Sequence, residues 1–263
     1  MSSFLRKIDN LDSYGRKISA FRLCAGSQPD DNKAPMHTHK QGQLVMPING
    51  MMTCRVSDAI WLVPKHHAVW IPAHIPHTNT PSKGAEFCFV YIDDSRQEMP
   101  HSCRTLSISP MLREMLIYLS DLPPEIQPDE NLEKLIDVAF FQLMQMPAEK
   151  LSFPLPSEKR LKKIADALIT TPSDRRTAEE WACDNAMSVR TFTRLVKSQT
   201  GMSFRDWRRQ LHIIVALQRL SEHWSIQAIS DELGYDSVSA FITMFKKELG
   251  KPPRQYLIEN INK

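Results

Sequence analysis

The stretch FTRLVKSQTGMSFRDW, residues 192–207, decides the fold of the last third of the chain, because it recurs as FITMFKKELGKPPRQY at residues 241–256. The second copy starts 49 residues after the first and repeats its apolar, basic, glycine and aromatic positions: Phe192 with Phe241, Val196 with Phe245, Lys197 with Lys246, Gly201 with Gly250 and Trp207 with Tyr256. A shorter helical pattern precedes each copy, TAEEWACDNA in the first and SIQAISDEL in the second. Each copy therefore predicts a helix, a short turn and a second helix, which is the helix-turn-helix plan.

Single residues mark the ends of these helices. Thr177, with Glu180 three residues later, has the pattern of a capping box, in which each side chain accepts from the other residue's backbone amide. Gly234 suits a left-handed turn in the second unit. We expect the second helices of the two units to span about residues 188–200 and 237–249.

The outer faces of these second helices carry the candidate DNA contacts. Phe192, Leu195 and Val196 recur at helical spacing and must face inward, as must their equivalents in the second copy. On the opposite face, arginine can donate to two acceptors of guanine, threonine and valine can contact a thymine methyl group, and lysine more often binds phosphate. The candidates are Arg190, Thr193, Arg194 and Lys197 in the first unit and Val238, Ser239, Thr243 and Lys246 in the second. A helical bundle with a basic surface is the alternative, and two units in register disfavour it.

The motifs S-x-R-T-F-x-R-L-V-K-x-x-x-G and LGYDSVSAFITMFKKELGKPPRQY resemble the two helix-turn-helix units of AraC/XylS-family transcription regulators, over about residues 157–258. The resemblance implies a connecting helix over about residues 204–222 that holds both second helices in successive major grooves, roughly 34 Å apart. It implies base contacts by Arg190, Thr193, Arg194, Val238, Ser239 and Thr243. The family commonly has an arginine where Thr243 and His212 stand, so we expect the first unit to carry more of the specificity.

Short strands and turns are predicted over about residues 18–95, which indicates a small barrel or sandwich. Asn49-Gly50 is typical of a two-residue hairpin turn. Two amphipathic helices follow at residues 109–146, with caps predicted at Ser109 and Asp129. They either pack on the barrel or bury a second copy of themselves in a homodimer. The proline-rich residues 147–156 are predicted to be a linker.

Two histidines open the barrel region in the stretch MHTHKQGQ, residues 36–43. The order His37, His39, Gln43, Gly50 and then WIPAHIPH, which ends in His77, resembles the two motifs of a cupin barrel over about residues 20–95. In cupin enzymes the matching positions are three histidines and a glutamate around a divalent metal, and Gln43 replaces the glutamate here. The resemblance implies an effector pocket lined by His37, His39, Gln43, Trp61, Trp70, His74 and His77, with His37, His39, Gln43 and His77 as candidate metal ligands. Trp61 fits an ordinary core position equally well.

Three interpretations of the histidines stay open. They are satisfied by hydrogen bonds in a polar pocket, they hold a metal that helps to bind an effector, or they hold a metal that performs oxygen or isomerase chemistry. Because glutamine is a neutral and weaker ligand than glutamate, the third interpretation is the least favoured.

Composition and charge limit the classes of protein. The chain has 263 residues and a net charge of +3. Residues 157–263 carry 18 Lys and Arg against 13 Asp and Glu, which favours a phosphate-rich partner only weakly. No apolar run approaches the ~18 residues of a membrane span, and the first residues lack the pattern of a signal peptide. The five scattered cysteines have no C-x-x-C pair, which fits reduced thiols in a cytoplasmic protein.

The sequence therefore predicts a multi-domain α+β protein. Its parts are a cupin-like effector-sensing barrel with an N-terminal arm (1–17) over residues 1–108, a helical hairpin over 109–146, a linker over 147–156, and an all-α DNA-binding domain with two helix-turn-helix units over 157–263. The predicted function is transcriptional regulation, in which a small effector changes binding to double-stranded DNA. The expected partners are a second copy of the chain and, for an activator, RNA polymerase, with no membrane. The rivals are a metal-dependent cupin enzyme with a helical appendage and an architectural DNA binder.

Overall fold

The computed structural model describes residues 18–25, 35–82, 84–93, 99–123, 126–149 and 151–260. The chain divides into two compact units, one of residues 1–56 and 61–150 and one of residues 57–60 and 151–263. The predicted N-terminal arm, residues 1–17, lies outside the described residues. Within the described part of the chain, no helix is both long and apolar enough to cross a membrane. The fold class predicted above, two-domain α+β with an all-α second domain, is confirmed.

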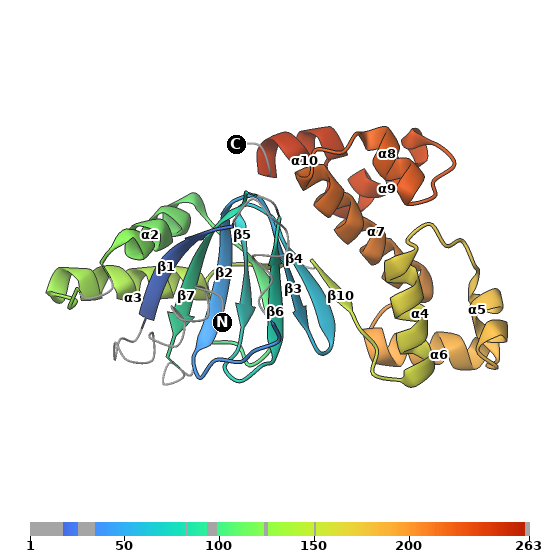
Figure 1. The fold of residues 1–263 in the computed structure, drawn as a ribbon, viewed down its shortest axis with the longest axis horizontal. Coiled ribbons are helices and arrows are strands. Elements are labelled where there is room, and N and C mark those ends of the chain that lie inside the picture. Colours follow the sequence, from blue (N-terminus) through green and yellow to red (C-terminus); the bar gives the residue numbers. More distant parts are fainter. Residues whose placement is uncertain are drawn as a thin grey trace. The chain divides into compact units, whose positions relative to one another are not determined.

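The first unit is built on two antiparallel sheets (Figure 1). One sheet has the strand order β1-β7-β2-β5-β8-β9, and in the other β3 lies between β4 and β6. The strands are β1 (Ile18–Cys24), β2 (Gly42–Asn49), β3 (Met52–Val56), β4 (Ala59–Val63), β5 (His67–Ile71), β6 (His77–Pro81), β7 (Glu86–Ile92), β8 (Arg104–Ser107) and β9 (Ala148–Glu149).

Side chains alternate between two apolar clusters along the strands, because successive residues of a strand point to opposite faces. Val45 of β2 and Phe89 of β7 face the second sheet and pack with Cys54 of β3 in the interior. Leu44 and Val90, their chain neighbours, lie in the other cluster, on the outer face of the first sheet.

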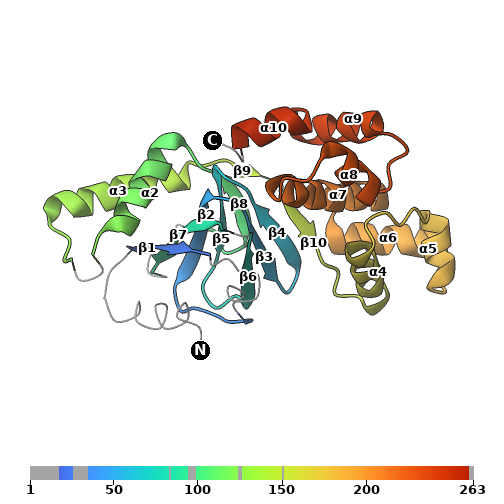
Figure 2. The same cartoon turned by 45° about the horizontal axis from the view of Figure 1, so that its top comes forward.

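That outer face is covered by α2 (Pro110–Asp121) and α3 (Glu130–Met144), as Figures 1 and 2 show. The predicted caps are confirmed, since the Ser109 side chain accepts from the Leu112 amide and the Asp129 side chain accepts from the Leu132 amide. One face of the two helices packs on the sheet through Leu112, Leu116, Leu119, Ala139, Phe140 and Leu143. Val138 and Phe141 remain exposed on α3, by 48% and 61%. Packing on the sheet therefore does not use the whole apolar surface of the hairpin.

Asn49-Gly50 does not close a hairpin, so that prediction is wrong. The strands on either side, β2 and β3, belong to different sheets, and the chain changes sheet at this turn. Gly50 has φ +75, and a Cβ atom there would lie 2.6 Å from the Cβ of Ala85. The glycine is therefore required by the backbone and by close packing, which is a different reason from a hairpin turn.

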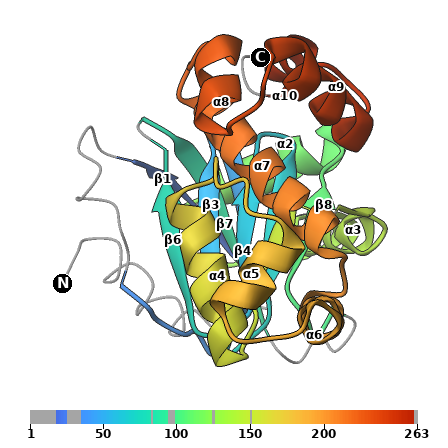
Figure 3. The same cartoon turned by 90° about the vertical axis from the view of Figure 1, so that its right-hand side faces the viewer.

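The second unit is helical. Its elements are the short strand β10 (Ser152–Pro154) and the helices α4 (Lys159–Thr170), α5 (Ala178–Asp184), α6 (Val189–Thr200), α7 (Phe204–Ser221), α8 (Ile226–Glu232), α9 (Val238–Leu249) and α10 (Pro253–Asn260). The long helix α7 runs between α4, α5 and α6 on one side and α8 and α9 on the other (Figures 1 and 3).

The helix boundaries in this unit agree with the predictions to within about a residue. Thr177 and Glu180 form the capping box at the start of α5. Ser188 and Ser237 cap α6 and α9, and Gly234 has φ +73. Phe192, Val196, Phe241 and Phe245 are fully buried. The two helix-turn-helix units therefore fold as the repeat predicted.

Residues 151–156 are packed into the unit rather than exposed as a linker, so this part of the linker prediction is wrong. Phe153 is fully buried, and its ring stacks on that of Trp207 with the centroids 5.1 Å apart. The Trp207 indole donates to the carbonyl of Pro154 at 2.9 Å, and the Leu155 amide donates to the carbonyl of Asp58 at 2.7 Å. The segment thus belongs to the core of the second unit.

Candidate nucleic-acid interface and histidine cluster

The two second helices of the helix-turn-helix units, α6 and α9, present the predicted DNA contacts on their outer faces. Arg190, Thr193, Arg194 and Lys197 are exposed on α6, and Ser239, Thr243 and Lys246 are exposed on α9, with Val238 half-buried. The apolar residues between them point into the unit's core. The structure therefore brings each predicted set together on one face of one helix.

Hydrogen bonds within α6 separate these side chains into two groups. The Thr193 hydroxyl donates to the carbonyl of Val189 at 3.0 Å, and the Lys197 ammonium donates to the carbonyl of Gly201 at 2.8 Å. Among the described residues, none is a hydrogen-bond or ion-pair partner of the Arg190 or Arg194 guanidinium. The guanidinium groups of these two arginines are therefore available to donate hydrogen bonds to a base edge.

A basic groove of about 800 Å³ borders α9, and the sequence analysis missed it. It is lined by Arg205, Arg208 and Arg209 of α7 and by Ser239, Thr243 and Lys247 of α9, among others. Arg205 and Lys247 are exposed, whereas Arg209 pairs with Glu248 at 2.7 Å. The run FRDWRR at the start of α7 contains the three arginines of this groove and is the sequence feature that could have predicted it.

His212 of α7, where the family resemblance implies an arginine, is half-buried and bound to its neighbours within the unit. Its Nδ1 lies 3.0 Å from the Tyr235 hydroxyl and its Nε2 lies 3.1 Å from the carbonyl of Pro172. Burial, reinforced by Arg208, lowers the pKa of His212 to about 4. The ring is therefore neutral at pH 7 and adds no positive charge to the groove.

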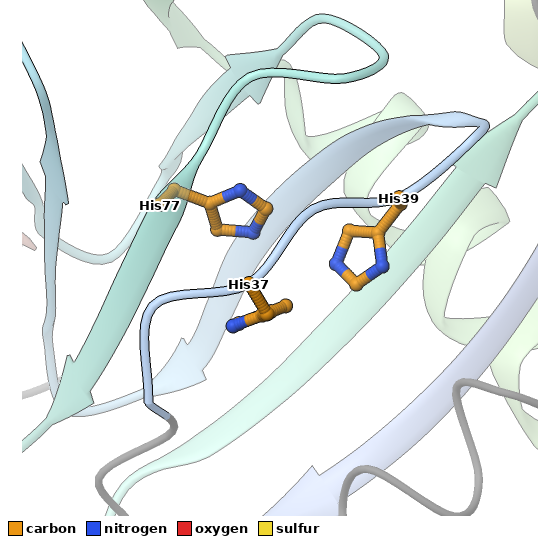
Figure 4. A group of neighbouring side chains, drawn as sticks. All are labelled: His37, His39 and His77. Atoms are coloured by element: carbon orange, nitrogen blue, oxygen red, sulfur yellow. The ribbon is translucent and has the colours of Figure 1, made fainter.

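The N-terminal unit brings His37, His39 and His77 together (Figure 4). His37 and His39 precede β2, and His77 begins β6, so the cluster joins two segments that are far apart in sequence. One ring nitrogen from each histidine lies within 4.8 Å of those of the other two. The centroid of the His37 ring lies 4.8 Å from that of His39 and 4.5 Å from that of His77.

Backbone carbonyls fix the tautomers of two of these rings. Nδ1 of His37 donates to the carbonyl of Pro35 at 2.7 Å, and Nδ1 of His77 donates to the carbonyl of Ile75 at 2.9 Å. Because a carbonyl oxygen only accepts, the proton sits on Nδ1 and the lone pair on Nε2. Nε2 of His39 and of His77 are buried without a hydrogen-bond partner among the described residues.

Two of the three rings, His39 and His77, are uncharged at neutral pH. Burial lowers the pKa of His39 to about 3, and the neighbouring His77 and His37 add to the shift. Burial likewise lowers the pKa of His77 to about 4, although its bond to the Ile75 carbonyl opposes the shift. A neutral imidazole with its lone pair on Nε2 is the form in which histidine binds metals through that atom.

Gln43 is fully buried and engaged with two neighbours. Its amide donates to the Tyr91 hydroxyl, and its carbonyl accepts from the Asn79 amide at 3.5 Å. The Tyr91 ring packs edge-on against His39, with the centroids 5.1 Å apart. Gln43 therefore lies in a polar layer beneath the histidines, and its role as a fourth ligand stays a prediction.

The two tryptophans predicted to line the pocket, Trp61 and Trp70, pack in different apolar clusters. Trp61 is half-buried and packs against the interior cluster. Trp70 is buried on the opposite face of the sheet, where its ring lies over Gly42 and its indole donates to the Pro100 carbonyl at 2.7 Å. Its prediction as a pocket wall is wrong, because its neighbours Val69 and Ile71 take the interior face of β5.

His74 contributes its backbone to this region. Its amide donates to the carbonyl of His39 at 2.8 Å, while its side chain is exposed at a turn with φ 63. The predicted pocket wall at His74 is therefore not formed by its ring.

Some known proteins are similar to the helical unit alone, and others are similar to nearly the whole chain. A helix-turn-helix domain family matches residues 181–258. The HTH-type transcriptional regulator NimR of Escherichia coli K12 is 39% identical over 246 residues, which cover 94% of this chain and 89% of NimR. The HTH-type transcriptional regulator RipA of Corynebacterium glutamicum is 29% identical over 39% of this chain and 31% of its own length.

Two solved structures are also similar. Fatty-acid-bound ToxT of Vibrio cholerae matches 94% of this chain and 96% of its own, at 12% identity and a TM-score of 0.39. The DNA-binding domain of AdpA, in complex with a target DNA, matches 37% of this chain and 88% of its own, at 23% identity and a TM-score of 0.35. The near-complete match to NimR, together with the paired helix-turn-helix units, settles the family. The chain belongs to the AraC family of DNA-binding transcriptional regulators.

Proposed function

We propose that the N-terminal unit senses a small effector at the histidine cluster and that this binding changes the affinity of the helical unit for its DNA site. The observation that supports this most strongly is the convergence of three imidazoles, each with a ring nitrogen within 4.8 Å of those of the other two. In two of them, His39 and His77, Nε2 is buried without a hydrogen-bond partner among the described residues. His37 and His39 are half-buried, so the cluster lies near the surface of the unit.

His37, His39 and His77 fit a divalent metal. Three imidazole nitrogens are a common donor set for zinc and related ions, and the carbonyls that hold two of the Nδ1 protons match the outer partners that usually orient such ligands. A metal bound there would supply a Lewis-acid centre. The chain's contribution is to fix the tautomers and to hold the three rings within one space.

On the DNA, Arg190, Thr193 and Arg194 of α6 read the first major groove, and Val238, Ser239 and Thr243 of α9 read the next. Lys197 and Lys246 bind phosphates. The exposed Arg205 and Lys247 in the basic groove add phosphate contacts between the two helices.

The active species is a homodimer that grips two half-sites. The exposed Val138 and Phe141 of α3 and Met111 and Tyr118 of α2 give the helical hairpin an apolar surface beyond the one packed on the sheet. Where the protein activates transcription, RNA polymerase is a further partner. Coupling between the effector and DNA sites of about 1–3 kcal/mol is sufficient for such a switch.

We propose that the cluster does not catalyse a reaction. Its relatives are transcriptional regulators, and Gln43 is an amide where an acid-base residue would need a carboxyl group. A purified protein that turns over a substrate in the presence of metal would support the rival cupin enzyme instead.

The decisive experiment measures DNA binding of the full chain with and without metal. A duplex is first selected from a random-sequence library, and its dissociation constant is then measured by fluorescence anisotropy with metal-free and Zn²⁺-loaded protein. We expect a change of about 5- to 150-fold on loading or on adding effector. His77→Ala should abolish this change, whereas His74→Ala, which removes an exposed ring outside the cluster, should preserve it. Equal responses of the two variants would refute the proposed sensing site.

A further inference from the structure

We infer that Val189, the first residue of α6, is a further base-reading residue of the first helix-turn-helix unit and that it contacts the methyl group of a thymine. This inference rests on the DNA contacts proposed above and deepens them, because it adds a residue and names the chemical group that the residue recognises. It follows from the exposure of Val189, from its place in the repeat and from the hydrogen bonds of its neighbour Thr193.

Val189 exposes a branched apolar side chain that packing within the unit does not use. It is 38% exposed, and in the described part of the second unit the other exposed large hydrophobic side chains are Trp224 and Ile258. Val189 begins α6 directly after the cap, Ser188. In a helix-turn-helix unit, the N-terminal residues of the second helix are the ones that contact base edges. The exposed valine therefore lies where a side chain is expected to meet DNA.

The repeat places a second valine at the equivalent position. Val238 begins α9 as Val189 begins α6, and each valine follows a capping serine, Ser188 or Ser237. Valine is a weaker helix former than alanine or leucine, so helix stability does not explain its use at both starts. Val238 is one of the predicted base contacts, whereas the sequence analysis missed Val189. The equivalence supports the same role for both residues.

Thr193 extends the apolar surface of Val189. The two residues lie four apart on α6 and are therefore neighbours on the helix surface. The Thr193 hydroxyl donates to the carbonyl of Val189 at 3.0 Å and lies 3.2 Å from the carbonyl of Arg190. Because its own helix engages the hydroxyl, the methyl group is the part of this exposed side chain that remains for a contact. Val189 and Thr193 thus form a stripe of methyl groups.

This methyl stripe runs beside the two arginines. Arg190 and Arg194 also lie four residues apart, and each directly follows a member of the methyl stripe. In the major groove, guanine offers two acceptors to an arginine, whereas thymine offers one acceptor and its methyl group. Two adjacent stripes of this kind match a guanine and a neighbouring thymine. The first half-site should therefore contain both bases, and the thymine methyl should contribute to specificity.

The test uses the full chain and a duplex selected from a random-sequence library. Each thymine of the duplex is replaced in turn by deoxyuridine, which removes only the methyl group, and the dissociation constant is measured by fluorescence anisotropy. A buried methyl group is worth roughly a 4-fold change in affinity. We expect the wild type to lose about that much at one thymine, and Val189→Ala to distinguish thymine from uracil there by less than about 2-fold.

Two further variants separate a base contact from a structural effect. Thr193→Ser keeps the hydroxyl that bonds to the Val189 carbonyl and removes only a methyl group, so it should also reduce the preference for thymine. Ile258→Ala removes exposed apolar surface from α10 and should keep the full preference. If Val189→Ala only disturbed the start of α6, it would bind the thymine and uracil duplexes more weakly by the same factor.

The possible failures are distinguishable. An unchanged preference for thymine in Val189→Ala, or a wild type that ignores every thymine methyl, overturns the inference. The proposed DNA contacts still stand in that case if Arg194→Ala loses affinity for the selected duplex. A wild-type chain that selects no duplex at all refutes the proposed contacts, and this inference falls with them.

Discussion

His37 and His77 are held together by their backbones as well as by their rings. The amide of each donates to the carbonyl of the other at 3.0 Å, and the ring centroids lie 4.5 Å apart. The contact joins the segment before β2 to the first residue of β6. Because the backbone pair does not depend on the ring, the metal-binding atoms can be removed without breaking the connection.

His77→Ala should therefore fold and lose tight metal binding. The substitution removes one of three imidazole ligands and leaves the two amide–carbonyl bonds of the bridge in place. Calorimetric titration with Zn²⁺ measures the loss, and circular dichroism checks the fold. Unchanged Zn²⁺ affinity in the variant would remove His77 from the ligand set.

Arg194→Ala should weaken binding to the selected duplex by about 1–3 kcal/mol and leave binding to random duplexes nearly unchanged, because a bidentate base contact carries specificity. Lys163→Ala, which removes an exposed positive charge from α4, is the matched control and should affect neither. The dissociation constants for the selected duplex and for random duplexes are measured by fluorescence anisotropy at one salt concentration. A loss of the same size on random duplexes would mean that Arg194 contacts phosphate.

Lys246→Ala should weaken binding to all sequences alike and lower the slope of log affinity against log salt by about 1, as expected for one lost phosphate contact. Lys197→Ala should have a smaller effect on the slope, because the Lys197 ammonium is bound to the carbonyl of Gly201 at 2.8 Å. Affinities measured over a series of salt concentrations compare the two. Equal slopes for Lys246→Ala and the wild type would place this lysine away from the DNA backbone.

Phe141→Asp should shift the protein from dimer toward a single chain of 30.2 kDa. The side chain is 61% exposed, so a charge costs the isolated chain little, whereas burying that charge in an apolar interface is unfavourable. Phe141→Leu keeps the surface apolar and should leave the dimer intact. Sedimentation equilibrium distinguishes these outcomes, and a dimer that tolerates the aspartate must use another surface.

His212→Gln should flatten the pH dependence of stability on the acid side. The folded-state pKa of His212 is lowered from 6.5 to about 4, so between these values the unfolded chain binds more protons than the folded chain. The free energy of unfolding therefore falls as pH decreases through this window and is fully retained above 6.5. Glutamine does not titrate and can still donate to the Pro172 carbonyl.

Denaturant unfolding of the wild type and the variant, at pH 7 and at about pH 5, measures the difference, since ΔG depends on the protons bound in each state. The wild type should lose more stability than the variant on acidification. An equal loss would show that other groups dominate the acid response.

Local sequence patterns were sufficient for the helical unit. Thr177 caps α5 as predicted, and Ser188 and Ser237, at the expected starts of the second helices, cap α6 and α9, because a cap depends on residues within one turn of the chain. The outer face of α6 was also predictable, since the position of each side chain around a helix follows from the buried positions of Phe192 and Val196.

Predictions were less successful where they depended on which distant part of the chain a strand or a segment packs against. Asn49-Gly50 has the composition of a hairpin turn, but the strand that follows it, β3, joins the other sheet, and no local residue pattern indicates this change. Trp70 was assigned to the wrong face, because the fully buried strand β5 has no polar side to reveal which of its faces is the interior. Phe153 was included in a linker, since nothing nearby in the sequence identifies Trp207 as its partner.

The sequence by itself determined two helix-turn-helix units, their boundaries and their exposed basic faces, because helix periodicity and capping are local properties of the chain. The cupin resemblance grouped His37, His39 and His77, but tertiary structure alone decided that Gln43 is bonded to Tyr91 and Asn79 and that Trp70 lies on the opposite face of the sheet. Those relationships depend on pairing between strands far apart in sequence, and the side chains that meet across such a pairing carry no local mark of their partners.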